Sequence, residues 1–288
     1  MTTFERDLQN AGNVSGVVLM NATSSAEWLR SRNLSADQTG SIHDDDRARS
    51  LGFKAALIGG SVHSAFVTKR AVELFGPQWY ERGFMKQAYI QPLYESDEFQ
   101  IVTDELKPGE FDERLHELAF ETRAGVRTTA GFFGLARSAE SAVAPWMRPE
   151  SQDPESEKAS LAAEFSRAIS VEESSSRREL TGDDSEWYRR SSPWGGAIVP
   201  SFMYMLLGSA GSRQEARESL PQAGMNSVWQ LLQKRPMLAG RSHRISVRVV
   251  QSGQSERSAF RTTEMTVRTE EGDVVAQARQ KIRWLLPK

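Results

Sequence analysis

The chain has 288 residues, with 36 basic and 38 acidic side chains, a formal net charge of −2 and no cysteine. A near-neutral charge argues against a general nucleic-acid binder, and the lack of cysteine excludes disulfides, thiolate nucleophiles and cysteine-based metal sites. The sequence has no apolar run of ~18–20 residues and lacks the basic-then-apolar pattern of a secretory signal, so we expect a cytoplasmic protein that does not enter a membrane.

The first half of the chain predicts one helix followed by four strands. Residues Ser61 to Phe75 place apolar side chains at helical spacing, and Gly76-Pro77 ends the helix. Alternating stretches, separated by turns rich in Asp, Pro and Gly, predict strands at Phe84–Tyr94, Glu98–Leu106, Arg114–Thr122 and Val126–Ala136.

A polar segment separates the two halves. Residues 151–158 show no apolar period and are typical of a solvated linker. We expect a linker over residues 138–180, with a short surface helix at Lys158–Ile169 and a loop or edge strand at Glu172–Arg178. The predicted domains are therefore residues 1–137 and 181–288.

The second half repeats the plan of the first. A short buried helix is predicted at Pro200–Leu207, and Glu271-Gly272-Asp273 predicts a hairpin turn. The predicted strands are Asn226–Gln233, His243–Val250, Ser258–Arg268 and Val274–Trp284.

Three landmarks recur in the same order in both halves. Gly60 and Gly196 each end a Gly-Gly pair before an apolar stretch and lie 136 residues apart. Pro92 and Pro236 are separated by 144 residues, and the turn glycines Gly125 and Gly272 by 147. The order predicts a diverged tandem duplication, in which each half wraps a strongly bent antiparallel sheet around one long helix. This is an α+β protein with two similar domains.

His43 is the main candidate for acid–base chemistry. It lies in a polar loop beside Asp44, Asp45 and Asp46, ahead of the helix that Gly59 and Gly60 open. A carboxylate can fix the tautomer of an imidazole that titrates near neutrality, and backbone N–H groups at a helix start can hold a developing oxyanion. This combination suits the transfer of a proton next to a thioester carbonyl.

Other interpretations of the same residues remain open. The three aspartates can instead favour the start of a short helix at Asp45–Leu51 through its dipole, and a metal site of His43 with them lacks a known ligand spacing. His63, on the predicted helix, is expected as a core or wall residue that can line a cavity near His43. His116 and His243 are expected to face water or charged neighbours.

The sequence contains no nucleophile elbow, P-loop or dinucleotide-binding fingerprint. The segment of the second half that corresponds to the His43 loop carries Arg189 and Arg190 but no histidine. We therefore expect one working half, while the other half serves as support or as a substrate tunnel.

The segment Ser41–Gly60 resembles the signature of the MaoC-like hydratase/dehydratase family, with a His, an Asp two residues later, Gly52-Phe53 and an apolar approach to Gly60. Pro92–Asp97 and Ser255–Glu264 continue the likeness, which covers nearly the whole chain except the linker. The resemblance implies two tandem hotdog folds arranged as a pseudo-dimer. It also implies reversible hydration of a 2-enoyl thioester, as in (R)-specific enoyl-CoA hydratases.

The resemblance assigns roles to particular residues. His43 becomes the acid–base histidine, while Gly59, Gly60 and Ser61 supply the oxyanion and substrate site together with His63. The family's aspartate stands five residues before the histidine, a position that Gln38 occupies here; Asp37 lies six residues before. Either Asp37 completes the pair through a longer loop, Asp45 substitutes for it, or the pair is lost.

The expected function is that of a hydro-lyase on an enoyl or 3-hydroxyacyl thioester, within fatty acid or polyketide metabolism. Two alternatives remain: a dehydratase or cyclase that tailors a specialised metabolite, and a non-catalytic thioester-binding subunit. No cofactor or metal is expected, because the substrate carries coenzyme A or phosphopantetheine. Expected partners are the acyl thioester and an acyl carrier protein, and the chain is expected as a monomeric pseudo-dimer or a homodimer.

Overall fold

The computed structural model describes residues 22–24, 27–36, 38–104, 115–136, 160–175, 181–183, 185–216 and 224–286. The elements of the first half are β1 (Ala22–Ser24), β2 (Leu29–Arg30), α2 (Asp45–Ser50), α3 (Gly60–Phe75), α4 (Gln78–Arg82), β3 (Gly83–Tyr89), β4 (Glu98–Asp104), β5 (Leu115–Thr122) and β6 (Arg127–Leu135). They are followed by β7 (Ser160–Ala168), α6 (Val171–Ser175), a 3-10 turn (Glu186–Tyr188), α7 (Met203–Ala216), β8 (Gly224–Gln233), β9 (Ser242–Gln254), β10 (Ser258–Arg268) and β11 (Val274–Leu285).

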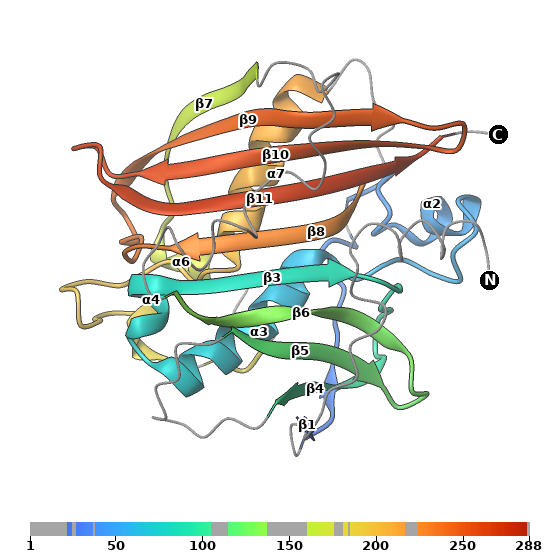
Figure 1. The fold of residues 1–288 in the computed structure, drawn as a ribbon, viewed down its shortest axis with the longest axis horizontal. Coiled ribbons are helices and arrows are strands. Elements are labelled where there is room, and N and C mark those ends of the chain that lie inside the picture. Colours follow the sequence, from blue (N-terminus) through green and yellow to red (C-terminus); the bar gives the residue numbers. More distant parts are fainter. Residues whose placement is uncertain are drawn as a thin grey trace.

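All strand pairs are antiparallel and form one continuous sheet, in the order β1-β4-β5-β6-β3-β8-β11-β10-β9-β7, with β2 paired to β4 (Figure 1). The order β4-β5-β6-β3 in the first half is the mirror of β8-β11-β10-β9 in the second half. The two halves therefore carry the same meander, and they meet where β3 pairs with β8, with Gln87 opposite Trp229.

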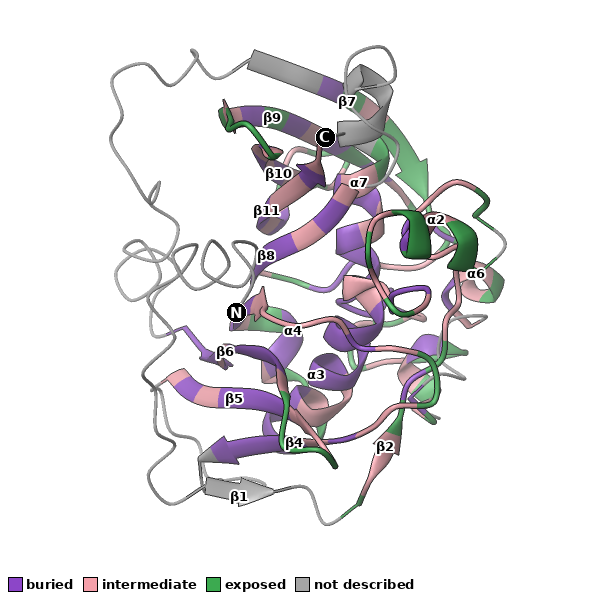
Figure 2. Ribbon diagram, turned by 90° about the vertical axis from the view of Figure 1, so that its right-hand side faces the viewer, coloured by how far each residue is buried: buried purple, intermediate pink, exposed green. Residues whose placement is uncertain are grey.

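Each half holds one long helix, and Figure 2 shows α3 and α7 on the same side of the sheet. Helix α3 is buried almost all round over its first turns, where Val62, Ala65 and Phe66 are each exposed by less than 5%. The curved sheet surrounds the helix, which explains the small residues on it. This is the double hotdog architecture that the resemblance implies.

The strands follow the sequence pattern closely. In β9 the buried residues Ile245, Val247 and Val249 alternate with the exposed Arg244 and Arg248, because one face covers α7 and the other meets water. The eight predicted strands are all present within a few residues of their expected bounds. The second long helix starts at Met203 and runs to Ala216, beyond the predicted Leu207.

Two predictions for the segment between the halves are wrong. Residues Ser160–Ala168, within the predicted surface helix, form strand β7, which pairs with β9 at the edge of the sheet. Pairing satisfies the backbone groups of β9, a tertiary demand that overrides local propensity. Residues Val171–Ser175 form a short helix in place of a loop or edge strand. The expected linker over 138–180 thus contains two elements, one of which belongs to the second sheet.

Backbone hydrogen bonds show how the two halves correspond. The N–H of Ile58 donates to Leu93, as that of Val199 donates to Met237; Ile90 donates to Thr128, as Lys234 donates to Val275. These pairs confirm the offsets of 144 and 147 residues. The Gly-Gly landmark is misaligned by five residues, because Gly60 corresponds to Ser201 and not to Gly196.

Within the described residues, no helix has both the length and the apolar character needed to cross a membrane.

Candidate active site

A narrow pocket of about 80 Å³ lies where the His43 loop meets the ends of β3, β8 and β11. In Figure 1 this loop and α2 lie beyond the C-terminal end of β3 and the start of β8. Both halves of the chain contribute to the pocket. Its lining consists of Ile42, His43, Phe53, Leu57, Ile58, Gly60, His63, Tyr89, Ile90, Gln91, Pro92 and Leu93 from the first half, and Gly224, Met225, Asn226, Ser227 and Arg283 from the second.

The His43 loop is joined to the segment before α3 by two hydrogen bonds around Leu57. The N–H of Leu57 donates to the carbonyl of Ile42 over 2.9 Å. The carbonyl of Leu57 lies 2.7 Å from Nδ1 of His43. Since a carbonyl oxygen only accepts, Nδ1 must carry the proton of this hydrogen bond, and the lone pair of the neutral imidazole resides on Nε2. A backbone carbonyl thus fixes the tautomer, a role for which the sequence suggests a carboxylate.

Asp44 starts helix α2, as the alternative interpretation of the acidic run predicts. Its carboxylate accepts hydrogen bonds from the N–H groups of Gly40, Asp46 and Arg47, at 2.9, 2.9 and 3.4 Å. These bonds, led by that of Gly40, hold the pKa of Asp44 below its usual range. Asn33 adds a bond to the carbonyl of His43 at 2.8 Å. The loop is therefore held by polar contacts on both sides of His43.

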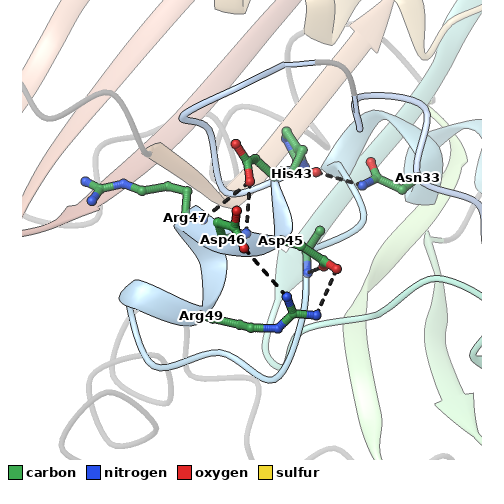
Figure 3. A network of polar contacts seen from close by, with 8 residues as sticks. Asn33, His43, Asp45, Asp46, Arg47 and Arg49 are labelled. Carbon is green, nitrogen blue, oxygen red and sulfur yellow. Dashed lines mark hydrogen bonds and ion pairs between the residues drawn. The ribbon is translucent and has the colours of Figure 1, made fainter.

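Asp45 does not line the pocket and is exposed. Figure 3 shows its side chain beside Arg49, whose guanidinium lies 2.9 Å from Oδ2. Its Oδ1 accepts a hydrogen bond from the N–H of Ala56 over 2.7 Å. Both oxygens are thus engaged away from the imidazole, and Asp45 joins α2 to the segment that carries Leu57. Asp45 is therefore not placed to pair with the imidazole of His43, which was one of the alternatives that the sequence left open.

The start of α3 lies against the imidazole. A Cβ atom added to Gly59 would lie 3.4 Å from Cε1 of His43, so the glycine allows close contact with the ring. Gly59 makes no side-chain cap, which leaves the first-turn amides and the positive end of the helix dipole facing this region. A Cβ on Gly60 would lie 3.0 Å from Tyr89 and 3.1 Å from Asn226, so a larger residue would crowd the pocket. Ser61, by contrast, does not line the pocket.

His63 lines the inner wall, as expected. Its Nδ1 lies 2.6 Å from Oγ1 of Thr129, and its ring stacks on Phe120 with centroids 5.5 Å apart. Burial lowers the pKa of His63 from 6.5 to about 3, because the protonated form would lose its hydration. His63 is therefore neutral near pH 7 and acts in the wall as a polar but uncharged group.

Several polar groups of the pocket escaped the sequence analysis, among them Tyr89 and Asn226. The hydroxyl of Tyr89 donates to the carbonyl of Gly60 at 3.2 Å, and burial raises its pKa well above the usual value. Asn226, from the second half, accepts a hydrogen bond from Gln280 at 2.5 Å. No local motif marks either residue. The end of β3, which carries Tyr89, and the start of β8, which carries Asn226, come together only through the antiparallel pairing of these two strands.

The remaining histidines do not face water, which was one of the settings expected for them. His116 is fully buried, with the rings of Phe75 and Phe133 at 6.2 and 6.3 Å. His243 is 3% exposed and its Nδ1 lies 3.0 Å from the carbonyl of Arg241. Both point to the buried face of their strands, which alternation leaves undetermined until the register is known.

The corresponding place in the second half is filled with side chains. The N–H of Ile198 donates to Trp187, as that of Leu57 donates to Ile42, so Tyr188 stands where the first half has His43. The hydroxyl of Tyr188 lies 2.8 Å from that of Tyr80, and Ser201 accepts a hydrogen bond from Trp79 over 2.9 Å. We call Trp79, Tyr80, Tyr188 and Ser201 the buried plug.

The expected partner Asp37 lies outside the described residues. Among the described residues that line the pocket, none is an aspartate or a glutamate. The described site therefore consists of the His43 imidazole with a defined tautomer, a glycine-opened helix start, the neutral polar groups of His63, Tyr89 and Asn226, and one cationic side chain, Arg283, beside apolar side chains.

Comparison with known proteins identifies the fold. No family model matches the chain, and no curated protein matches its sequence. Among solved structures, a protein described as a MaoC domain dehydratase from Chloroflexus aurantiacus aligns over 95% of this chain and 97% of its own, with a TM-score of 0.60 and 11% identity.

Two further structures cover nearly the whole chain. A Mycobacterium tuberculosis protein described as a double hotdog fold has a TM-score of 0.57 and 11% identity, over 94% of this chain and 98% of its own. A protein described as an oleoyl thioesterase from Lactobacillus plantarum has a TM-score of 0.50 and 10% identity, over 94% and 100%. The chain therefore has the double hotdog fold, which occurs in proteins described both as dehydratases and as thioesterases.

Proposed function

We propose that this protein is a hydro-lyase that adds water to, or removes it from, an enoyl or 3-hydroxyacyl thioester. The observation that carries the proposal is the hydrogen bond of His43 to Leu57, which leaves the Nε2 lone pair as the base at a pocket next to the start of α3. The structural likeness to a MaoC domain dehydratase supports the same reaction class.

In this proposal, each step of the reaction is assigned to a group of the pocket. Nε2 of His43 accepts a proton from water as its oxygen bonds to C3, and the imidazolium then returns a proton to C2. The N–H groups at the start of α3, with Gly60 first, stabilise the negative charge that develops on the thioester oxygen between these steps. The neutral wall of His63 and Tyr89 adds no competing charge.

The remaining lining suits an acyl group. Ile42, Leu57, Ile58, Leu93 and Met225 present apolar surface around the imidazole, and removing an acyl chain from water favours binding by about 25 cal/mol per Å² of apolar surface. In this proposal the substrate carries coenzyme A or the phosphopantetheine of an acyl carrier protein, so the protein needs no cofactor of its own.

Two alternatives use the same pocket. Tailoring of a specialised metabolite would be the same dehydration, or a cyclisation, on a different acyl group. A thioester-binding subunit without catalysis is favoured by one observation: no carboxylate occurs among the described pocket residues. That function would require binding without turnover.

The test compares wild type with His43→Gln on crotonyl-CoA, following both loss of the conjugated enoyl thioester and release of free thiol. We expect hydration by the wild type and a decrease of at least about 100-fold in the variant, since a positioned general base contributes 10²–10⁴. His243→Gln, a histidine on β9 outside the pocket, is the matched control and should retain activity.

Each of the other outcomes leads to a different conclusion. Thiol release without hydration assigns a thioesterase. Turnover on a panel of carrier-bound metabolites, but not on crotonyl-CoA, assigns the tailoring enzyme. Binding of the thioester without any reaction assigns the binding subunit, and equal turnover by wild type and His43→Gln refutes the role of His43.

A further inference from the structure

Arg283 is the one arginine or lysine in the lining of the pocket, among the residues that the structure describes. It lies near the end of β11, where it is opposite Met225 of β8 on one side and Phe260 of β10 on the other. Neither of these two side chains has a carboxylate that could pair with the guanidinium of Arg283. Met225 packs against Ile42 and Leu57, so Arg283 enters the pocket next to the loop that carries His43.

The sheet provides a contrast four residues earlier on the same strand. Arg279 is opposite Glu264 of β10, and its guanidinium forms an ion pair with that carboxylate. Arg283 has no such carboxylate partner in the described ranges; its Nε, like that of Arg279, is buried there without a hydrogen bond. The two arginines differ in the missing carboxylate and in the position of Arg283 in the pocket lining. A partly buried charge without a counter-charge is destabilising, so this arrangement is expected where a ligand supplies the acceptor.

The rest of the lining leaves the charge of Arg283 uncompensated. The described pocket residues include no carboxylate, and the neighbouring Asn226 and Ser227 are neutral. A guanidinium presents a planar set of donors that matches a carboxylate or a phosphate with two parallel hydrogen bonds. The ligand group that best complements this wall is therefore an oxyanion.

We propose that Arg283 binds an anionic group of the thioester ligand: either a carboxylate on the acyl chain or the phosphate of the phosphopantetheine arm. The inference rests on the proposed function for the thioester itself and adds the class of group that the second half of the chain recognises. It makes the second half a contributor to specificity, while the first half supplies the base.

The test measures equilibrium binding by calorimetry with three saturated thioesters, which cannot be hydrated. Butyryl-pantetheine is neutral, succinyl-pantetheine carries a carboxylate on the acyl group, and butyryl-4′-phosphopantetheine carries the phosphate. Wild type should bind one anionic probe at least about tenfold more tightly than the neutral probe, and the probe that gains identifies the source of the anion.

Arg283→Gln should lose that preference while binding of the neutral probe changes less than about twofold, and Arg283→Lys should keep part of it. Arg248→Gln, an exposed arginine on β9 outside the pocket, is the matched control and should keep the preference entirely. If wild type prefers neither anion, or if Arg283→Gln keeps the preference, the inference is wrong. Comparing the three probes on the wild type tests for an anion preference even if Arg283→Gln does not fold.

The binding assay separates this inference from the proposed function. An anion preference that depends on Arg283, in a protein that does not hydrate crotonyl-CoA, supports the inference and contradicts the hydro-lyase. Hydration of crotonyl-CoA without any anion preference supports the hydro-lyase and contradicts the role of Arg283. If none of the three probes binds, both the proposed function and the role of Arg283 are contradicted.

Discussion

At the scale of single residues, the hydrogen bond between His43 and Leu57 sets the chemistry of the pocket. A carbonyl acceptor at 2.7 Å fixes the tautomer and the orientation of the imidazole through a group that carries no net charge. The sequence indicated His43 and the glycines of the helix start. It could not indicate Leu57, because an apolar side chain gives no sign that its carbonyl faces a histidine.

Substitutions of Asp45 test whether its carboxylate takes part in the reaction or only positions the His43 loop. We expect Asp45→Asn to retain most of the hydration activity, because an amide oxygen can still accept the hydrogen bond of Ala56. Asp45→Ala removes that bond and should lower kcat/KM by about tenfold through displacement of the His43 loop. The measurement is steady-state hydration of crotonyl-CoA by both variants. Equal and large losses in the two variants would show that the charge itself is required.

His63 makes stability depend on pH. Its folded-state pKa of about 3 lies below the unfolded value of 6.5, so the unfolded chain takes up the proton first as the pH falls. The stabilisation by neutral His63 is complete above pH 6.5 and is lost as the pH falls toward 3. Between pH 7 and pH 5 this residue should reduce the free energy of unfolding by about 2 kcal/mol.

The measurement is urea unfolding of wild type and His63→Gln at both pH values. The variant starts from a lower stability, because its contact with Thr129 changes, but its decrease between pH 7 and pH 5 should be smaller by about 2 kcal/mol. An identical decrease in both proteins would mean that His63 titrates normally in the folded state.

At the scale of elements, strand patterns predicted the meanders well, whereas β7 and α6 were not predicted. Alternation such as that of β9 records a buried and a solvated face, which is a local property of the sequence. The segment Ser160–Ala168 forms a strand because the edge of β9 is available for pairing, and that edge exists only in the folded protein. The faces of His116 and His243 were undetermined for the same reason.

The buried plug should support stability without affecting the reaction, since it lies at the opposite end of the β3–β8 pair from the pocket. Trp79 is fully buried, and its indole N–H donates to Ser201. Trp79→Ala should destabilise the fold by about 3–5 kcal/mol through loss of packing, and Trp79→Phe by about 1–2 kcal/mol through loss of the hydrogen bond.

Chemical denaturation measures both effects, and the crotonyl-CoA assay provides the control. Trp79→Phe should hydrate at the wild-type rate wherever it remains folded. A loss of activity as large as that of His43→Gln would place the plug in the reaction after all.

At the scale of the whole molecule, both halves contribute residues to one pocket. The duplication explains the mirrored strand order, and β3 pairs with β8 so that one strand's end meets the other's start. The sequence predicted the duplication and a single acid–base site. It could not predict that Asn226 and Arg283 reach that site, because their contribution depends on the register of a junction between segments about 140 residues apart.

The most direct test of a single His43 site on a thioester is the product that forms from crotonyl-CoA in D2O, observed by NMR. Wild type should yield 3-hydroxybutyryl-CoA with one deuterium at C2 in a single configuration, since one imidazole delivers it from one face, and His43→Gln should yield none above the uncatalysed rate. Free crotonate, a C2 deuterium distributed over both configurations, or unchanged product from His43→Gln would contradict this account.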